Sequence, residues 1–146
     1  MSWAYGKTSR QNRDSCSEGL IRVMNRGLIL SPVDIAIVWG WRGEEIQTGL
    51  FLSGASKKEW PFSEHNTMRD DEPYSSAFDF APYVNGIPWR DTHSFSLVSG
   101  VFMAAASIEG VILRWGGDWD GDGLTTDQTF MDYGHLEEEK QLGEQS

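Results

Sequence analysis

The sequence of 146 residues has a single cysteine, Cys16, so it cannot form an internal disulfide. Packing or a bound metal must therefore stabilise the fold, as expected of a protein made in a reducing compartment. Cations are also scarce, because 12 Lys and Arg stand against 22 Asp and Glu and give a formal net charge of −10. Phosphate binding needs a cationic surface, so this balance argues against nucleic acid as a partner. It is compatible with binding of a divalent cation.

Long apolar runs are absent as well. The longest one, Val101 to Ala106, is far shorter than the roughly 18 residues that span a bilayer, so we expect no membrane insertion. The first ten residues contain no apolar stretch of the kind that a secretory signal requires. We therefore expect no signal peptide and a protein that stays in the cytoplasm of the producing cell. The length suits one domain with a sizeable core.

Helix and strand patterns alternate in mixed order along the chain. Helices are expected where apolar residues recur at helical spacing behind a capping residue, and strands where short apolar runs end at Gly or Pro. The predicted helices are 20–28, 44–52 and one capped by Asp91 or Thr92 whose inner face is Phe95, Val98, Val101, Phe102, Ala105 and Ile108. The predicted strands are 33–38, 77–81 (ending at Pro82) and 111–115, and 116–130 is a Gly- and Asp-rich loop. This order favours an α+β fold with a small antiparallel sheet and helices packed on it.

Four residues have the types and spacing that a zinc hydrolase needs. Such a site takes three ligands from His, Asp or Glu, leaves a fourth position for water, and needs a free carboxylate to accept that water's proton. Asp79 stands in an apolar run and must be paired, hydrogen-bonded or metal-bound if it is buried. His135 follows Asp132 by three residues, while His65 lies in an irregular polar stretch. Each of the three possible ligands also has a simpler interpretation. His65 could be a solvated loop histidine, Asp79 a core carboxylate bonded to backbone amides, and His135 the end of a strand. The third histidine, His93, falls outside every motif and is predicted to lie on the surface.

Several short motifs occur in a characteristic order. They are Gly40-Trp41-Arg42, Gln47, Gly54-Ala55-Ser56-Lys57, Ser63-Glu64-His65, Ala77-Phe78-Asp79, Trp115-Gly116-Gly117-Asp118-Trp119 and Asp132-Tyr133-Gly134-His135. This order resembles the zinc L-alanyl-D-glutamate and D-alanyl-D-alanine peptidases, which cut the stem peptides of bacterial peptidoglycan. The likeness is greatest to the compact endopeptidases that tailed bacteriophages use as endolysins, and it covers about residues 19–138. It implies the Hedgehog/D-alanyl-D-alanine-peptidase fold, in one domain over residues 1–138 with a charged tail at 139–146.

The resemblance assigns a role to each motif residue. It implies that zinc is bound by His65, Asp79 and His135, and that Asp132 is the general base. Arg42 would offset charge on the oxyanion or bind a substrate carboxylate, although it could also be a surface charge at a helix start. Further substrate contacts are suggested for Ser63, Gln47 and Trp119. The loop holds other acids that compete with Asp132 as the base, namely Asp118, Asp120, Asp122 and Asp127.

The spacing of the first two ligands departs from the family pattern. Thirteen residues, 66–78, separate His65 from Asp79, which is more than the family usually has. We interpret residues 66–76 as a loop insertion, since surface insertions cost little in closure entropy.

The acidic loop suggests a second metal. Asp118, Asp120 and Asp122 place carboxylates at alternate positions and Gly123 stands at the sixth, as at the start of a calcium-binding loop. The match stops there, because Thr129 occupies the position of the bidentate Glu. Calcium binding and an acidic, turn-rich loop are both compatible with this pattern. If calcium orders the loop, it sets the position of the segment that carries the general base.

The function expected from these features is zinc-dependent hydrolysis of the L-alanyl-D-glutamate bond in peptidoglycan stem peptides, for host lysis, by a monomer. By resemblance, release to the wall would need a holin-type partner that permeabilises the membrane. Two alternatives remain: a D-alanyl-D-alanine carboxypeptidase or dipeptidase with the same metal core, and a non-catalytic, metal-stabilised wall-binding module.

Overall fold

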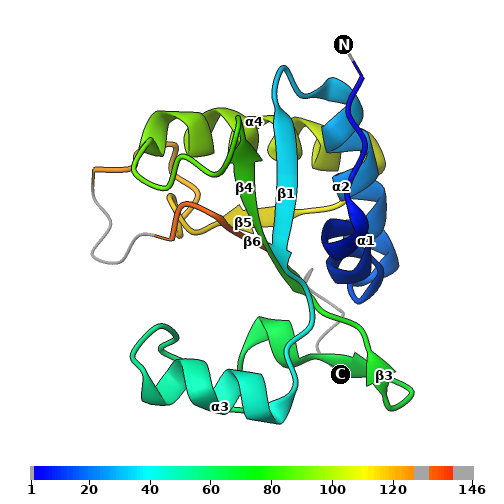
Figure 1. Cartoon of the computed structure of the whole chain (residues 1–146), viewed down its shortest axis with the longest axis vertical. Coiled ribbons are helices and arrows are strands. Elements are labelled where there is room, and N and C mark those ends of the chain that lie inside the picture. Colours follow the sequence, from blue (N-terminus) through cyan, green and yellow to red (C-terminus); the bar gives the residue numbers. More distant parts are fainter. Residues whose placement is uncertain (1, 127–131, 140–146) are drawn as a thin grey trace.

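The computed structural model describes residues 2–126 and 132–139 (Figure 1). Four α-helices, one 3-10 helix and six strands occur in mixed order among these residues. They are α1 (Lys7–Asp14), α2 (Glu18–Leu30), β1 (Asp34–Trp39), α3 (Glu44–Leu52), η1 (Glu64–Asn66), β2 (Met68–Arg69), β3 (Glu72–Pro73), β4 (Ala77–Tyr83), α4 (Thr92–Glu109), β5 (Leu113–Trp115) and β6 (His135–Glu138). No helix in this part of the chain combines the length and apolar character that crossing a membrane requires.

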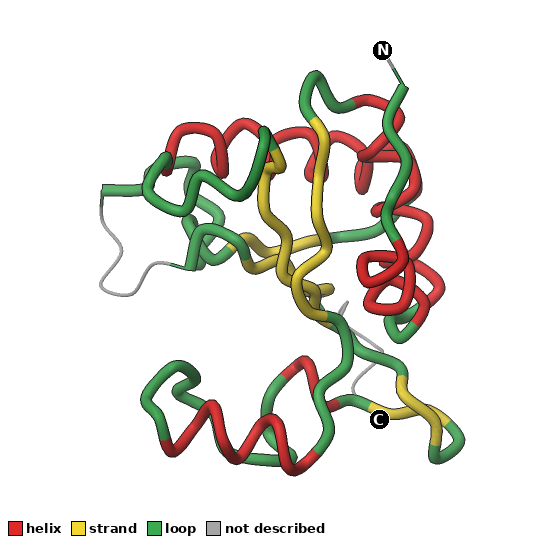
Figure 2. Tube along the Cα trace, in the orientation of Figure 1, coloured by secondary structure: helices red, strands yellow, loops and turns green. Residues whose placement is uncertain are grey.

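The main sheet is small and antiparallel. Its strand order is β1-β4-β6-β5, and every neighbouring pair runs antiparallel. Helix α1 packs against β1, while α2 and α4 pack against each other. Helix α3, η1 and the short β2–β3 hairpin form a separate lobe beyond the ends of β1 and β4 (Figures 1 and 2). The chain leaves the sheet after β1 to form this lobe and returns from η1 to β4, so the lobe lies across from one end of the sheet. The predicted α+β class is confirmed.

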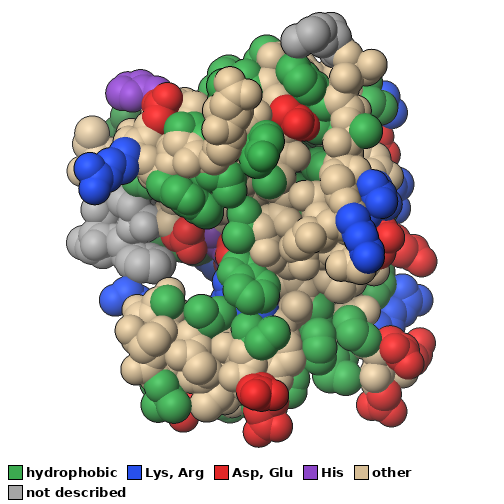
Figure 3. Space-filling model, viewed as in Figure 1, with side chains coloured by type: hydrophobic (Ala, Val, Ile, Leu, Met, Phe, Trp, Pro, Cys, Tyr) green, Lys and Arg blue, Asp and Glu red, His purple; other side chains and the backbone are tan. Residues whose placement is uncertain are grey.

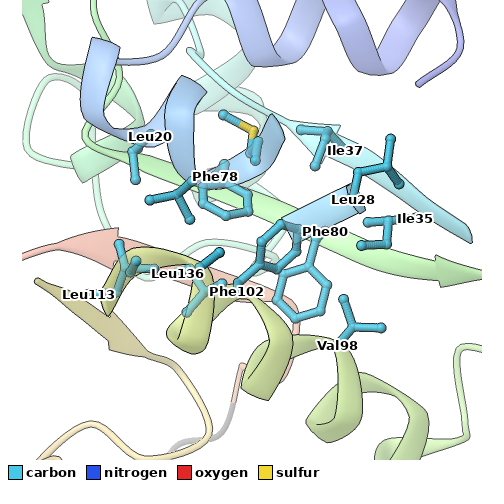
Figure 4. Packing of buried hydrophobic residues seen from close by; sticks show 14 of the residues in the cluster. Leu20, Leu28, Ile35, Ile37, Phe78, Phe80, Val98, Phe102, Leu113 and Leu136 are labelled. Carbon is cyan, nitrogen blue, oxygen red and sulfur yellow. The ribbon is translucent and has the colours of Figure 1, made fainter. Parts of the chain in front are cut away.

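The core lies between the sheet and helices α2 and α4 (Figure 4). Phe78 and Phe80 of β4 are fully buried and make edge contacts with Phe102 of α4, with ring centroids 5.1 and 5.2 Å apart. Gly27 of α2 allows this packing, because a Cβ there would stand 2.5 Å from the Phe102 ring. Side chains alternate across a strand, so Asp79, between the two phenylalanines, points to the opposite face. The core thus fixes the direction of the carboxylate.

Most predicted elements are present, with shifted ends. Helix α2 begins behind Ser17, whose hydroxyl accepts from the Leu20 N–H, and α4 begins behind Asp91, whose carboxylate accepts from the Ser94 N–H. Strand β4 continues through Pro82, contrary to the prediction that it ends there. Pro82 pairs only with Ile35 of β1, since β6 reaches no further than the opposite end of β4. A missing N–H on the open side removes no ladder bond.

Three further points differ from the prediction or add to it. Ile108 was predicted on the inner face of α4, yet it is 58% exposed, because it lies to one side of the helix face that buries Phe95, Val98, Phe102 and Ala105. Helix α1 was not predicted at all, since it is polar and buries only Ser9. The predicted loop 66–76 contains the β2–β3 hairpin, whose turn residues Asp70 and Asp71 have φ of 53° and 61°. Paired positive φ values are typical of a two-residue hairpin turn.

Of the predicted tail, the structure describes only its first residue. Glu139 donates its backbone N–H to the Ile112 carbonyl over 2.9 Å, directly after the end of β6. Residues 140–146, like Asp127 and Thr129 of the acidic loop, lie outside the described residues.

Candidate metal centre and cleft

Two of the predicted ligands face each other across neighbouring strands. In the β4–β6 ladder Asp79 pairs directly with His135, and paired residues of antiparallel strands share one face of the sheet. The Asp79 Oδ1 and His135 Nδ1 atoms are 3.0 Å apart. The β1–β4 ladder shifts register between Ile37 and Trp39, opposite Asp79. The strand pairing therefore delivers one carboxylate and one imidazole to the end of the sheet that faces the α3 lobe.

The third predicted ligand, His65, lies in that lobe. His65 sits in η1, where the Ser63 hydroxyl accepts from the His65 N–H and the Asn66 side chain accepts from the Ser63 N–H, forming a capping box. The segment is tied to the chain after β1, because Arg42 donates its backbone N–H to the His65 carbonyl over 2.8 Å. Asn66 returns a side-chain bond to the Arg42 carbonyl at 3.0 Å. His65 is thus held rigidly although it lies in no strand or α-helix.

The three side chains converge on one point. His65 Nε2 lies 3.3 Å from both Asp79 Oδ1 and His135 Nδ1, and these three residues form a cluster able to hold a metal ion. Tetrahedral coordination with bonds of about 2.0–2.1 Å separates ligand atoms by about 3.3 Å. The observed spacing of 3.0–3.3 Å fits that requirement. The simpler interpretations, a solvated loop histidine and a strand end without a partner, do not describe buried side chains that meet.

Hydrogen bonds on the outer side of each imidazole determine which nitrogen faces the centre. His65 Nδ1 lies 2.8 Å from the Gly40 carbonyl, and His135 Nε2 lies 2.8 Å from Glu137 Oε1. Both partners are acceptors, so with a metal ion at the centre each of these outer nitrogens would carry the proton and the opposite nitrogens would present their lone pairs. Two lone pairs and a carboxylate oxygen then face one another, and only a bound cation or a proton relieves their repulsion. Outer partners of this kind are typical of metal-binding histidines.

The electrostatics of the cluster favour positive charge at its centre. Burial opposes ionisation of Asp79, but the charges and hydrogen bonds of His65 and His135 outweigh it and hold the pKa of the Asp79 carboxyl well below its usual range. Burial also lowers the pKa of His135, yet its bonds to Asp79 and Glu137 raise that pKa to about 10. The same bond, with help from Arg114, lowers the pKa of Glu137 against the effect of burial. A site that attracts a proton so strongly is suited to a divalent cation.

Asp132 stands beside this centre and lines the same cavity as His65 and His135. Its backbone N–H donates to the Gly116 carbonyl over 2.8 Å. Gly116 must be glycine, because a Cβ there would stand 2.2 Å from the Asp132 carbonyl oxygen. Burial and the neighbouring charge of Asp79 raise the pKa of the Asp132 carboxyl. A carboxylate with a raised pKa next to a metal centre is suited to accept a proton from water.

Arg42 is a buried member of the site rather than a surface charge. Its side chain donates to Asp79 Oδ2 over 2.8 Å, and the residue is 8% exposed. Burial lowers its pKa against the effect of that carboxylate. The guanidinium also lies over the Trp39 ring, 5.1 Å from its centroid. Arg42 Nε is buried and has no hydrogen-bond partner within the described residues.

The centre opens into a cavity of about 360 Å³ between the α3 lobe and the sheet. Ser63 and Trp119 line this cavity, and the Trp119 ring lies 5.6 Å from the His135 ring. The surface is hollowed there, with basic and histidine side chains visible inside (Figure 3). Gln47, which was also predicted to contact substrate, is fully buried and does not line the cavity. The 66–76 segment contributes none of the described residues that line the cavity.

The three aspartates of the proposed calcium loop also come together. Asp118, Asp120 and Asp122 bring carboxylate oxygens within 4.8 Å of one another. Asp118 Oδ2 accepts from the Gly123 N–H at 2.8 Å, while Asp118 Oδ1 is buried without a partner in the described part of the chain. This group is separate from the His65–Asp79–His135 cluster. These three aspartates were among the alternatives to Asp132 as general base. They form a group of their own, whereas Asp132 lines the cavity next to His65 and His135.

Sequence reasoning missed two contributors to the site. Glu137 stands in a run of acidic residues and was assigned no role, yet it is buried in β6 and bonded to His135 and Arg114. The period-two alternation His135-Leu136-Glu137 was the available signal, because it places His135 and Glu137 on one face of a strand. Gly40 acts through its backbone carbonyl, which no side-chain pattern reveals. His93, as predicted, is exposed in the first turn of α4.

Comparison with known proteins identifies relatives of this chain. A curated L-alanyl-D-glutamate peptidase of Escherichia phage T5 is 36% identical over 141 residues, which cover 94% of this chain and 98% of that protein. The crystal structure of the L-Ala D-Glu endopeptidase ChiX of Serratia marcescens has a similar fold, with a TM-score of 0.73 at 22% identity over 93% of this chain and 90% of the other. The family model described as phage L-alanyl-D-glutamate peptidase matches residues 1–138. The chain therefore belongs to the phage L-alanyl-D-glutamate peptidase family.

Proposed function

We propose that this protein is a zinc peptidase that hydrolyses the L-alanyl-D-glutamate bond of peptidoglycan stem peptides. The observation that carries the proposal is the convergence of His65 Nε2, Asp79 Oδ1 and His135 Nδ1 within 3.3 Å, at the wall of an open cavity. Two imidazoles and one carboxylate leave a fourth tetrahedral position, which is the donor set of a catalytic zinc site. The family relationship supplies the substrate.

The mechanism assigns a role to each residue at the metal centre and in the cavity. Zinc held by the three ligands would supply Lewis acidity, which activates water near neutral pH and polarises the amide carbonyl. Asp132 accepts the proton of the attacking water and passes it to the leaving amine. Arg42 borders the cavity and stabilises negative charge on the tetrahedral intermediate through its guanidinium. Ser63 and Trp119 border the cavity and contact the peptide.

Digestion of purified peptidoglycan by the zinc-loaded protein tests this function. We expect new L-alanyl carboxyl ends and D-glutamyl amino ends, identified by mass spectrometry, and zinc at one equivalent per chain by metal analysis. Release of D-alanine instead would indicate the D-alanyl-D-alanine activity. Binding to the wall with no new amine ends would indicate a non-catalytic wall-binding module.

We also propose that Asp118, Asp120 and Asp122 bind calcium, which orders the loop leading to Asp132. The unpartnered Asp118 Oδ1 and the proximity of the three carboxylates support the proposal. Isothermal titration of the zinc-loaded protein with calcium should give a heat that is absent when Asp118 and Asp122 are changed to Asn. Wall digestion should also slow when calcium alone is chelated. Absence of the heat, with turnover indifferent to calcium, would contradict this site.

The remaining biological expectations follow from family membership and are proposals too. The protein would act as a monomer on the cell wall after lysis begins, and a holin-type partner would give it access from the cytoplasm. Residues 1–138 would form the peptidase domain, with 66–76 as an insertion and 139–146 as a charged tail.

A further inference from the structure

The cleft has two arms that meet at Arg42 and Asp132 and differ in character. One is the cavity at the metal centre described above. The other, of about 380 Å³, is also bordered by Arg42 and Asp132 and continues along Trp39, Trp89 and Phe95. A substrate bound at the metal centre therefore extends in two directions, over two different surfaces.

The first arm has a cationic wall formed by the loop that comes after α3 in the sequence. Lys57 and Lys58 border it, and buried Gln47 holds their loop from below. The Gln47 side-chain amide donates to Ser56 Oγ over 2.9 Å and to the Lys58 carbonyl over 2.6 Å. Its oxygen accepts from Arg42 at 3.4 Å. The lysine loop is thus fixed relative to the arginine of the site.

Lys58 brings a positive charge with no counterion to this arm. Within the described residues, no carboxylate forms an ion pair with its ammonium group. Two other charged residues of this arm are engaged within the protein, since Arg114 pairs with Glu137 at 2.8 Å and the Glu64 carboxylate accepts from the Ser76 hydroxyl at 2.8 Å. In a chain of net charge −10, a cation at the cavity wall with no ion-pair partner among the described residues is suited to a carboxylate on a bound molecule.

The second arm is aromatic. Trp89 is 62% exposed and stacks on Phe95, with ring centroids 6.1 Å apart and planes at 28°. Among the described residues that line this arm, Arg42 is the one cation, and it is shared with the first arm. Such a surface is suited to an uncharged group that presents apolar area.

Taken with the proposed function, this asymmetry orients the substrate. The glutamyl residue after the scissile bond is linked onward through its γ-carboxyl, so its α-carboxylate is free beside the scissile nitrogen. The acyl half, an N-acylated L-alanyl group, carries no charge. We propose that Lys58 binds the free α-carboxylate of the D-glutamyl residue and so determines specificity, with the leaving half in the cationic arm and the acyl half in the aromatic arm.

Matched substrates test this assignment. The zinc-loaded protein would be given muramoyl tripeptides with D-glutamate or with D-isoglutamine, which replaces the α-carboxylate by an uncharged carboxamide. We expect about a tenfold higher kcat/KM for the carboxylate substrate, because a charge-assisted contact is lost in the amide. Lys58→Met should lower kcat/KM for the carboxylate substrate alone, so that the preference falls to about one. Lys7→Met, an equal change of charge on exposed α1, should keep the preference.

Other outcomes overturn the assignment in distinguishable ways. Equal cleavage of both substrates by the unchanged protein would leave the peptidase function standing and reject the carboxylate contact. A preference that survives Lys58→Met would reject the role of Lys58. If Lys58→Met lowered kcat/KM only for substrates with diaminopimelate, and not lysine, at the third position of the stem peptide, Lys58 would instead contact the carboxylate of that third residue. Cleavage of neither substrate would reject the proposed function and this inference together.

Discussion

Replacing His65 with alanine is expected to abolish zinc binding and wall digestion together. His65 is 2% exposed and supplies one of three donor atoms, and the loss of even an outer partner of a metal ligand typically costs roughly 10–100-fold in affinity. We therefore expect at least a hundredfold weaker zinc binding. Metal analysis after dialysis, together with peptidoglycan digestion, measures both effects.

Thermal unfolding separates loss of metal from loss of fold. Zinc at about 1,000 times its dissociation constant would stabilise the unchanged protein by about 4 kcal/mol, so added zinc should raise its Tm and leave that of His65→Ala unmoved. His93→Ala is the matched control, because this exposed histidine of α4 lies outside the cluster. For Glu137→Gln we expect zinc to raise the Tm by an amount between those of His93→Ala and His65→Ala, with roughly tenfold weaker zinc binding. A dialysed His65→Ala protein that kept one zinc per chain would refute the ligand assignment.

The candidate metal-binding residues could be picked out from the sequence because the chemistry of each restricts where it can stand. Asp79 stood out as a carboxylate in an apolar strand, and its burial without a partner would be costly. His135 stood out by its spacing from Asp132. What the sequence could not provide was the register that pairs Asp79 with His135, since strand pairing depends on packing across the whole sheet. The convergence of the donors was therefore a prediction from resemblance until the structure showed it.

The parts that escaped prediction share a physical cause. Helix α1 is polar, so its single buried side chain, Ser9, leaves no apolar periodicity to detect, although the Ser9 hydroxyl accepts from the Ile37 N–H of β1. Glu137 gave no signal of burial, because it is acidic and its neighbours Glu138 and Glu139 are also acidic. In both cases polar residues are fixed by hydrogen bonds to distant segments. Patterns of hydropathy, which indicate burial of apolar area, do not detect such bonds.

Replacing Asp132 with asparagine is expected to separate catalysis from metal binding. The amide is similar in size and keeps the backbone bond to Gly116, but it cannot accept a proton from water. General-base catalysis typically contributes about 10²–10⁴-fold, so we expect kcat to fall by that factor while zinc stays at one equivalent and Tm changes little. Single-turnover digestion of a defined muropeptide, with metal analysis of the same preparation, checks both halves.

Glu64→Gln is the matched control for this variant, because Glu64 is the other carboxylate of the cavity that is not bonded to an imidazole of the centre. Its bond to the Ser76 hydroxyl survives as an amide contact, so we expect turnover within a fewfold of the unchanged protein. If Glu64→Gln lost activity and Asp132→Asn kept it, the proton acceptor would be Glu64. The raised pKa of Asp132, due to burial and to the charge of Asp79, would then serve another purpose. Because both side chains border one cavity, only this reciprocal comparison distinguishes the base from a neighbouring charge.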